Sequence, residues 1–197
     1  ALQAAIDADV CNRAAEVKGE IAFAGRRESM VDRLLDLQRN GDIPLVTTHN
    51  DTKLNNVMLD DATGEGICVI DLDTVMPGLS LYDFGDMVRT AVRPCPEDEV
   101  DLSKVVARGE MFEAIARGYL ASAGDALNAV EKDHLAFSAK LITFEIGMRF
   151  LTDYLQGDVY FKTHRPHQNR DRCRVQFAMA ASLESKMDAM QQVVTRI

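Results

Sequence analysis

The chain has 197 residues with a hydrophobic fraction of 47%, and its formal net charge is −9 at pH 7. This length and this apolar fraction are typical of one globular domain with an ordinary core. The negative charge, with a pI near 4.9, excludes a dedicated nucleic-acid surface, because binding to phosphates needs a positive field. No apolar run approaches the roughly 20 residues that span a bilayer, so we expect a cytoplasmic protein with neither membrane nor nucleic acid among its partners.

Most of the chain shows the periodicity of amphipathic helices. Helices are predicted at approximately residues 2–17, 27–38, 82–92, 103–123, 126–155 and 170–194. Asn40 and Gly41 end the second of these, and Pro94 and Pro96 follow the third and break it. The helix at 126–155 has a wide apolar stripe, which is typical of a helix at the centre of a bundle.

The stretch from Pro44 to Arg89 differs from the rest of the chain. It holds two short apolar runs of β type at 56–59 and 67–72, and each lies beside a cluster of polar residues. Residues 75–78, Val-Met-Pro-Gly, predict a turn, because proline followed by glycine favours a tight reversal. The sequence therefore predicts a mainly α protein with a small β-hairpin or sheet near its front.

The polar cluster beside the first run has the spacing His49-x-Asp51-x-x-x-x-Asn56, which is a pattern of kinase catalytic loops. Phosphoryl transfer needs a carboxylate that accepts the proton of the attacking hydroxyl, and oxygen ligands that hold Mg²⁺ against the phosphates. Asp51 suits the first role and Asn56 the second. Asp71, at the end of the second run, is placed to supply another magnesium ligand, and Asp73 would share its side of the strand if the strand continued.

Three segments of the stretch together resemble a known family: HNDTKLNN at 49–56, VIDLD at 69–73 and YDFGD at 82–86. They resemble the aminoglycoside-phosphotransferase-like small-molecule kinases, and within that group they are most similar to the N-acetylhexosamine 1-kinases. The resemblance covers essentially the whole chain. It implies a single carboxy-terminal, helical lobe of the protein-kinase-like fold over 1–197, with the catalytic loop and metal site at 44–89 and a helical substrate subdomain at 100–197.

The resemblance also implies the chemistry. By this likeness ATP is the phosphate donor and Mg²⁺ the metal cofactor. Asp51 is then the catalytic base, and Asn56 and Asp71 bind the magnesium of the nucleotide cofactor. His49 and Asp83 would brace the catalytic loop.

By the same resemblance, the acceptor is a sugar hydroxyl, specifically the anomeric hydroxyl of N-acetylglucosamine or N-acetylgalactosamine. Its expected contacts are Arg149 and Tyr160 first, and then Asp51, Asp73, Thr74 and Arg89. Arg149 also fits a structural role, as an arginine whose stem packs along a core helix while its charged head reaches water. Two alternatives remain open: an acceptor that is another small alcohol or an aminoglycoside, and a non-catalytic kinase-like module that binds without turnover.

The chain departs from the family pattern in two respects. Asn50 stands where glycine is usual, and asparagine tolerates unusual backbone angles better than most residues. The chain also shows no glycine-rich phosphate loop and no strand lysine of the type that pairs with nucleotide phosphates, and it begins without methionine inside a helical pattern. We therefore expect a fragment that is inactive by itself and whose partner is an amino-terminal nucleotide lobe of the same protein.

Overall fold

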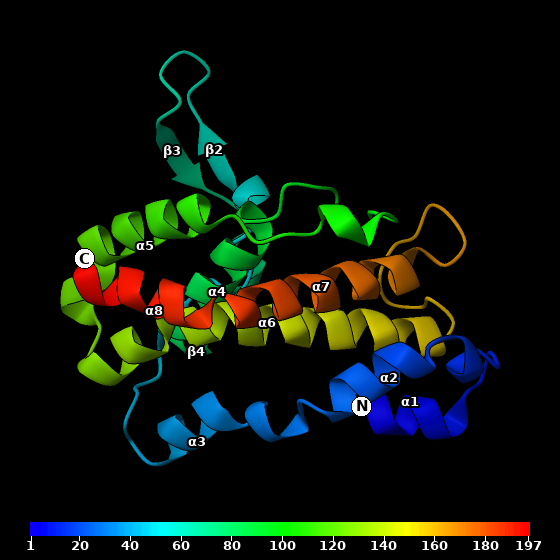
Figure 1. Cartoon of the computed structure of the whole chain (residues 1–197). Coiled ribbons are helices and arrows are strands. Elements are labelled where there is room, and N and C mark those ends of the chain that lie inside the picture. The colour runs from blue at the N-terminus through cyan, green and yellow to red at the C-terminus, as the bar shows by residue number, and fades with distance from the viewer.

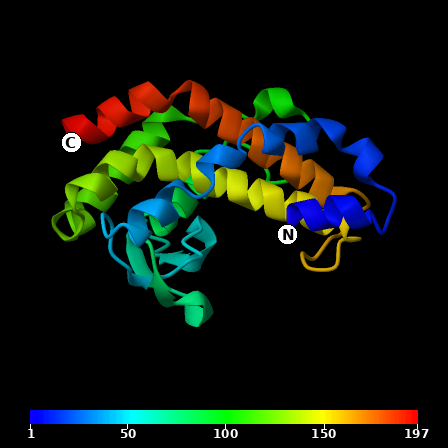
Figure 2. The same ribbon diagram turned by 90° about the horizontal axis from the view of Figure 1, so that it is seen from below.

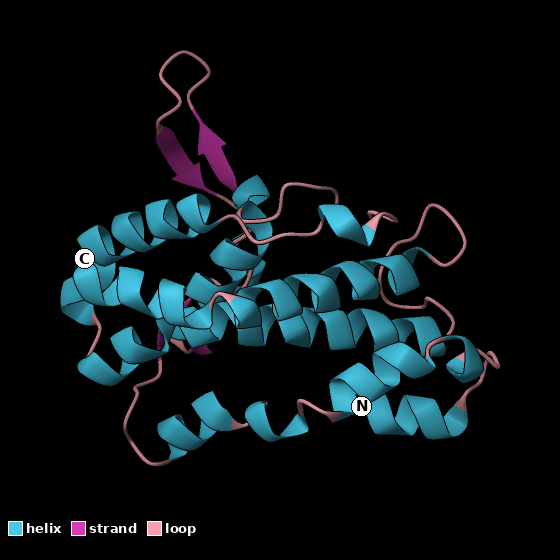
Figure 3. Ribbon diagram, viewed as in Figure 1, coloured by secondary structure: helices cyan, strands magenta, loops and turns pink.

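Two long antiparallel helices form the centre of the structure, a computed structural model that describes residues 1–197. They are α6 (Ala129–Leu155) and α7 (Gln168–Ser185), which pack against each other (Figure 1). Helix α4 (Ser80–Ala91) packs against α6 as well. The fold is mainly helical with two small sheets of two strands each, which confirms the predicted fold class (Figure 3).

The remaining helices surround this centre. Their bounds are α1 Leu2–Ala8, α2 Lys18–Gly25, α3 Arg33–Arg39, α5 Gly109–Ala123 and α8 Met187–Arg196. Helices α1 to α3 follow one another below α6 in Figure 1, and the view from below in Figure 2 shows α1 against the carboxy-terminal end of α6. Helices α5 and α8 contact each other at the opposite end of the molecule.

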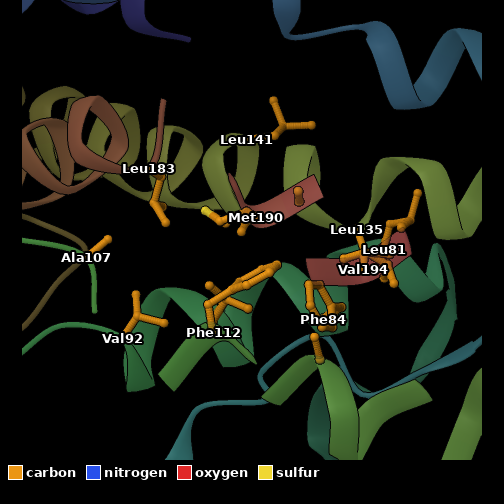
Figure 4. Close-up of a cluster of buried hydrophobic side chains, with 14 of the residues drawn as sticks. Leu81, Phe84, Val92, Ala107, Phe112, Leu135, Leu141, Leu183, Met190 and Val194 are labelled. Atoms are coloured by element: carbon orange, nitrogen blue, oxygen red, sulfur yellow. The ribbon is translucent and has the colours of Figure 1, made fainter. Parts of the chain in front are cut away.

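A large hydrophobic cluster joins α4, α5, α6, α7 and α8. Figure 4 shows side chains from all five helices in this cluster, among them Phe84, Phe112, Leu135, Leu183 and Met190. Phe84 of α4 and Phe112 of α5 meet edge to face with their ring centroids 6.0 Å apart, an arrangement that aromatic rings favour. A second cluster joins α1 and α2 to the carboxy-terminal half of α6. Burial in the first cluster fixes the position of α4.

The two sheets lie within the stretch that carries the catalytic motif. Strand β1 (Val46–Thr48) pairs antiparallel with β4 (Met76–Gly78), and β2 (Val57–Leu59) pairs antiparallel with β3 (Gly66–Val69) to form a hairpin that projects from the helices (Figure 1). The turn predicted at 75–78 was wrong, since residues 76–78 form β4. Pro77 is tolerated there because a two-stranded sheet has only edge strands, where a missing N–H need not break the ladder.

Several helix boundaries also differ from the prediction. The pattern at 2–17 is interrupted by Asp9, which takes left-handed backbone angles (φ 33°), and the last predicted helix is broken at Lys186 into α7 and α8. Helices α3 and α5 begin later than expected. Periodicity does not mark such breaks, because apolar residues on both sides can face the same core, as Leu183 and Met190 do.

Gly85 lets α4 approach α6 closely. A Cβ at this position would lie 2.7 Å from the backbone oxygen of Ser138 and 2.7 Å from Cγ1 of Ile142. We predict that Gly85→Ala lowers the free energy of unfolding by about 1–3 kcal/mol, because overpacking forces the helices apart. Chemical denaturation followed by circular dichroism measures the change. The matched control is Gly118→Ala, in an open part of α5, which is expected to stabilise by up to about 1 kcal/mol; stabilisation by both substitutions would contradict the close packing.

Candidate active site

The loop after β1 is held by one carboxylate of α4. Both oxygens of Asp83 accept backbone hydrogen bonds from this loop, from His49 N at 2.8 Å and from Asn50 N at 2.7 Å. The backbone carbonyl of Asp83 also accepts a hydrogen bond from Thr52 Oγ1 at 2.6 Å. Because the core fixes α4, these bonds fix the loop that carries Asp51.

Asn50 adopts the left-handed backbone conformation, with a φ of 63°. This is the position where glycine was expected, and asparagine is one of the few other residues that occupy this region at low cost. Its side chain adds support, since Nδ2 donates to the Thr74 carbonyl at 3.1 Å and Oδ1 accepts from Thr48 Oγ1 at 3.0 Å. Asn50 therefore adopts the backbone angles that the turn needs, and its side chain forms hydrogen bonds to neighbouring segments.

His49 connects the loop to the segment that precedes Asp71. Its Nε2 lies 3.0 Å from the carbonyl oxygen of Ile70, and Asp51 N donates to its Nδ1 at 3.3 Å. Both contacts fit the tautomer with its proton on Nε2. The carbonyl of His49 accepts from Thr74 Oγ1 at 2.5 Å. The histidine thus contacts backbone groups beside both the predicted base and the predicted metal ligand.

The side chain of Asp51 is held by two hydrogen bonds. Its Oδ2 accepts hydrogen bonds from Lys53 Nζ at 2.5 Å and from Asn56 Nδ2 at 2.9 Å. Partial burial raises the pKa of the Asp51 carboxyl, but these two hydrogen bonds and the nearby charges of Lys53 and His49 outweigh burial and hold the pKa below its ordinary value. Its Oδ1 makes no hydrogen bond within the chain, so an ionised carboxylate keeps one oxygen free to accept a proton.

Lys53 is a site residue that the motif analysis missed. Its Nζ pairs with Asp51 Oδ2 and lies 3.8 Å from Asp71 Oδ2, so its ammonium lies between the predicted base and a predicted metal ligand. The signal in the sequence was its position two residues after Asp51, inside the motif itself. A cation at this point can neutralise both carboxylates and attract a phosphate.

Asn56 contacts Ile70, the neighbour of Asp71, at the base of the β2–β3 hairpin. Ile70 N donates to the Asn56 carbonyl at 2.9 Å, and Asp71 follows in a left-handed conformation (φ 63°). Asn56 is buried, and its Nδ2 donates to Asp51, which leaves its Oδ1 for a cation. No three His, Cys, Asp or Glu side chains gather as a metal site. One carboxylate and one amide oxygen nevertheless fit Mg²⁺, which is usually held by one or two carboxylates together with waters and substrate phosphates.

Three further residues predicted to contact the substrate lie in different surroundings. Asp73 does not lie on a strand, because residues 72–74 form a short 3₁₀ helix, and its side chain is exposed. Thr74 donates its hydroxyl hydrogen to the backbone of the catalytic loop, so it supports the loop. Arg89 is buried and paired with Asp86 and Glu97, so its guanidinium belongs to the interior.

Arg149 and Tyr160, the residues expected to hold the sugar, lie side by side. Arg149 Nη2 is 3.5 Å from the Tyr160 hydroxyl, and the guanidinium carbon is 5.7 Å from the centre of the tyrosine ring. Both line a cavity of about 260 Å³. Arg149 also lines a second cavity of about 490 Å³ between α6 and the amino-terminal helices. Asp51 lines neither cavity, so the structure brings these two residues together without placing them in contact with the catalytic loop.

A helical lobe that carries a braced catalytic loop and a hairpin ending in an aspartate is the arrangement of a protein-kinase-like phosphotransferase. Residues 2–125 match the model of the phosphotransferase enzyme family, APH. The chain belongs to this family. The matched range contains the loop, the hairpin and α4, and it ends before Arg149 and Tyr160. None of the helices combines the length and the apolar character needed to cross a bilayer.

Lys53 is predicted to keep Asp51 ionised at acid pH. Lys53→Met removes a hydrogen bond and a favourable charge while burial remains, so the pKa of Asp51 rises. Because a general base must be ionised, the acid limb of the rate–pH profile of the full-length protein then moves to higher pH. Lys53→Arg keeps the charge and is expected to stay near wild type. An acid limb that does not move in Lys53→Met would contradict this role.

Proposed function

We propose that the protein is an ATP-dependent phosphotransferase that phosphorylates the anomeric hydroxyl of an N-acetylhexosamine. The observation that carries the proposal is the convergence of Asp51, Asn56 and Asp71. Asp51 accepts a hydrogen bond from Asn56, and Lys53 lies between Asp51 and Asp71. A module without this chemistry has no need to gather a base, two oxygen ligands and a lysine.

Each residue has a role in this proposal. Asp51 accepts the proton of the acceptor hydroxyl as its oxygen forms a bond to phosphorus and the bond to the nucleotide oxygen breaks. Asn56 and Asp71 hold Mg²⁺, which when bound neutralises the charge of the phosphates. Lys53 adds positive charge toward the transferred group. His49 and Asp83 keep the loop in position.

The exposed surface of the hairpin is an argument for a partner lobe. All four residues of β3 are exposed, and the exposed apolar side chains include Met58, Ile67 and Val69, the last two at 62% and 51%. By the strand register, Ile67 and Val69 lie on one face of the hairpin and Met58 on the other, and exposed apolar side chains on both faces favour an interaction surface. The proposal therefore includes a carboxy-terminal lobe at 1–197, with its catalytic loop at 44–89 and its substrate subdomain at 100–197, and an amino-terminal nucleotide lobe of the same protein that covers the hairpin.

The acceptor assignment is supported by Arg149 and Tyr160. An aromatic ring offers an apolar surface to the face of a sugar ring, and a guanidinium donates hydrogen bonds to its oxygens. The two residues line the cavity of about 260 Å³ together. Arg149, but not Tyr160, also lines the cavity of about 490 Å³, which lies within the size range of small-molecule sites.

Asp51→Asn in the full-length protein is predicted to lower kcat by roughly 100- to 10,000-fold, because an amide cannot accept the proton. The affinity for the magnesium nucleotide should change little. The assay is ³¹P NMR of transfer from ATP to N-acetylglucosamine and N-acetylgalactosamine. Asp125→Asn, an exposed carboxylate between α5 and α6, is the matched control and should keep the wild-type rate.

Three other results would change the proposal in different ways. Wild-type turnover by Asp51→Asn would show that Asp51 is not the catalytic base. Efficient transfer to an aminoglycoside or another alcohol, but to neither hexosamine, would contradict the proposed acceptor. It would still support the phosphotransferase reaction. Nucleotide binding without transfer to any acceptor would indicate a non-catalytic module. The 197-residue chain by itself is expected to be inactive, and turnover by it would contradict the need for a second lobe.

A further inference from the structure

The larger cavity combines an apolar side with a polar side. It lies between the amino-terminal helices and the carboxy-terminal half of α6, and its volume is about 490 Å³. Ile6, Ile21 and Met148 contribute apolar surface, and Glu145 and Arg149 contribute charge. Small-molecule sites typically have this composition, in which a few polar groups orient a ligand against apolar walls.

Glu145 and Arg149 are four residues apart on α6, so they share one face of the helix, and both line the cavity. Glu145 has no hydrogen-bond or ion-pair partner within the chain, and the side chain of Arg149 has one hydrogen bond, its long contact with Tyr160. Burial raises the pKa of the Glu145 carboxyl, Arg149 lowers it, and Asp86 raises it further. Glu145 is nevertheless an exposed residue that lines the cavity, so its carboxyl oxygens are available to accept hydrogen bonds from a ligand there.

The cavity is close to the helix that holds the catalytic loop. Burial raises the pKa of the Tyr82 hydroxyl, and the charges of Glu145 and Asp32, which both line the cavity, raise it further. Helix α4 also packs closely on α6, where Gly85 faces Ser138 and Ile142, and Glu145 follows Ile142 by three residues. The residue after Tyr82 on α4 is Asp83, whose carboxylate holds the loop. The cavity and the proposed reaction site are thus connected through α6, which lines the cavity and packs against α4.

The charged side chains that line the cavity favour some classes of acceptor over others. Three carboxyl groups, those of Glu28, Asp32 and Glu145, line it together with one guanidinium, that of Arg149. The excess of negative charge disfavours anionic acceptors such as sugar phosphates and sugar acids. Hydroxyl groups donate to carboxylates, and an acyl oxygen accepts from a guanidinium. The pair on α6 therefore fits a neutral sugar that has free ring hydroxyls and an acylamino group.

We propose that Glu145 is a specificity-determining residue of the acceptor site. Its carboxylate accepts hydrogen bonds from ring hydroxyls of a neutral acylated amino sugar, while Arg149 donates to the acyl oxygen. This inference rests on the proposed function and names the residue that selects the acceptor. Glu145 takes no part in proton transfer, which belongs to Asp51.

Calorimetric titration of the full-length protein tests this assignment. The variants are Glu145→Gln, which keeps the shape of the side chain, and the matched control Glu110→Gln, an exposed glutamate of α5. The probes are N-acetylglucosamine, its 3-deoxy and 4-deoxy analogues, and magnesium ADP. Glu145→Gln is expected to raise the Kd for N-acetylglucosamine about tenfold or more, whereas the control leaves this Kd unchanged and neither variant alters the Kd for magnesium ADP.

The deoxy analogues separate recognition from a structural effect. In the wild-type protein, at least one analogue should bind about tenfold more weakly than N-acetylglucosamine, and in Glu145→Gln this penalty should largely disappear. Equal penalties in both proteins, or wild-type sugar affinity in Glu145→Gln, would overturn the inference. Efficient phosphorylation of an anionic acceptor would also overturn it while leaving the phosphotransferase reaction in place, so the two failures are distinct.

Discussion

The carboxylate of Asp83 is the contact on which the rest of the proposed site depends. It accepts the backbone N–H groups of His49 and Asn50, where the chain leaves β1 and turns into the loop that carries Asp51. Buried or partly buried N–H groups need such partners, and here a side chain supplies them in place of a strand. Because α4 is packed into the helical core at Gly85, the loop takes its position from the core.

A second constraint is electrostatic. Bringing Asp51 and Asp71 together places two negative charges in one small region, where they repel each other. Lys53 offsets this repulsion because its ammonium pairs with one carboxylate and lies 3.8 Å from the other. In the proposed reaction Asp71 helps to hold the divalent cation and Asp51 accepts the proton, so the lysine lies between the two proposed functional groups. Asp83 thus holds the backbone of the loop, and Lys53, within the loop, balances its negative charge.

Much of this arrangement could be predicted from the sequence, and the exceptions have physical reasons. Long helices are visible in their periodicity, and the family match over residues 2–125 agrees with the resemblance of the motif segments between residues 49 and 86. Strand β4 could not be predicted, because Pro77 and Gly78 suggest a turn locally and the strand exists only through pairing with β1. The burial of Arg89 depends on a partner in a later loop, Glu97. The cavity on α6 forms between distant segments and leaves no local pattern.

Amide hydrogen exchange of His49 and Asn50 tests the central claim most directly. In Asp83→Asn only one side-chain oxygen remains as an acceptor, so one of these two amides loses its partner. The account predicts that at least one of them then exchanges about tenfold faster than in the wild-type protein, while the core amides of α6 keep their protection. Unchanged protection of both loop amides in Asp83→Asn would contradict the claim that this carboxylate positions the catalytic loop.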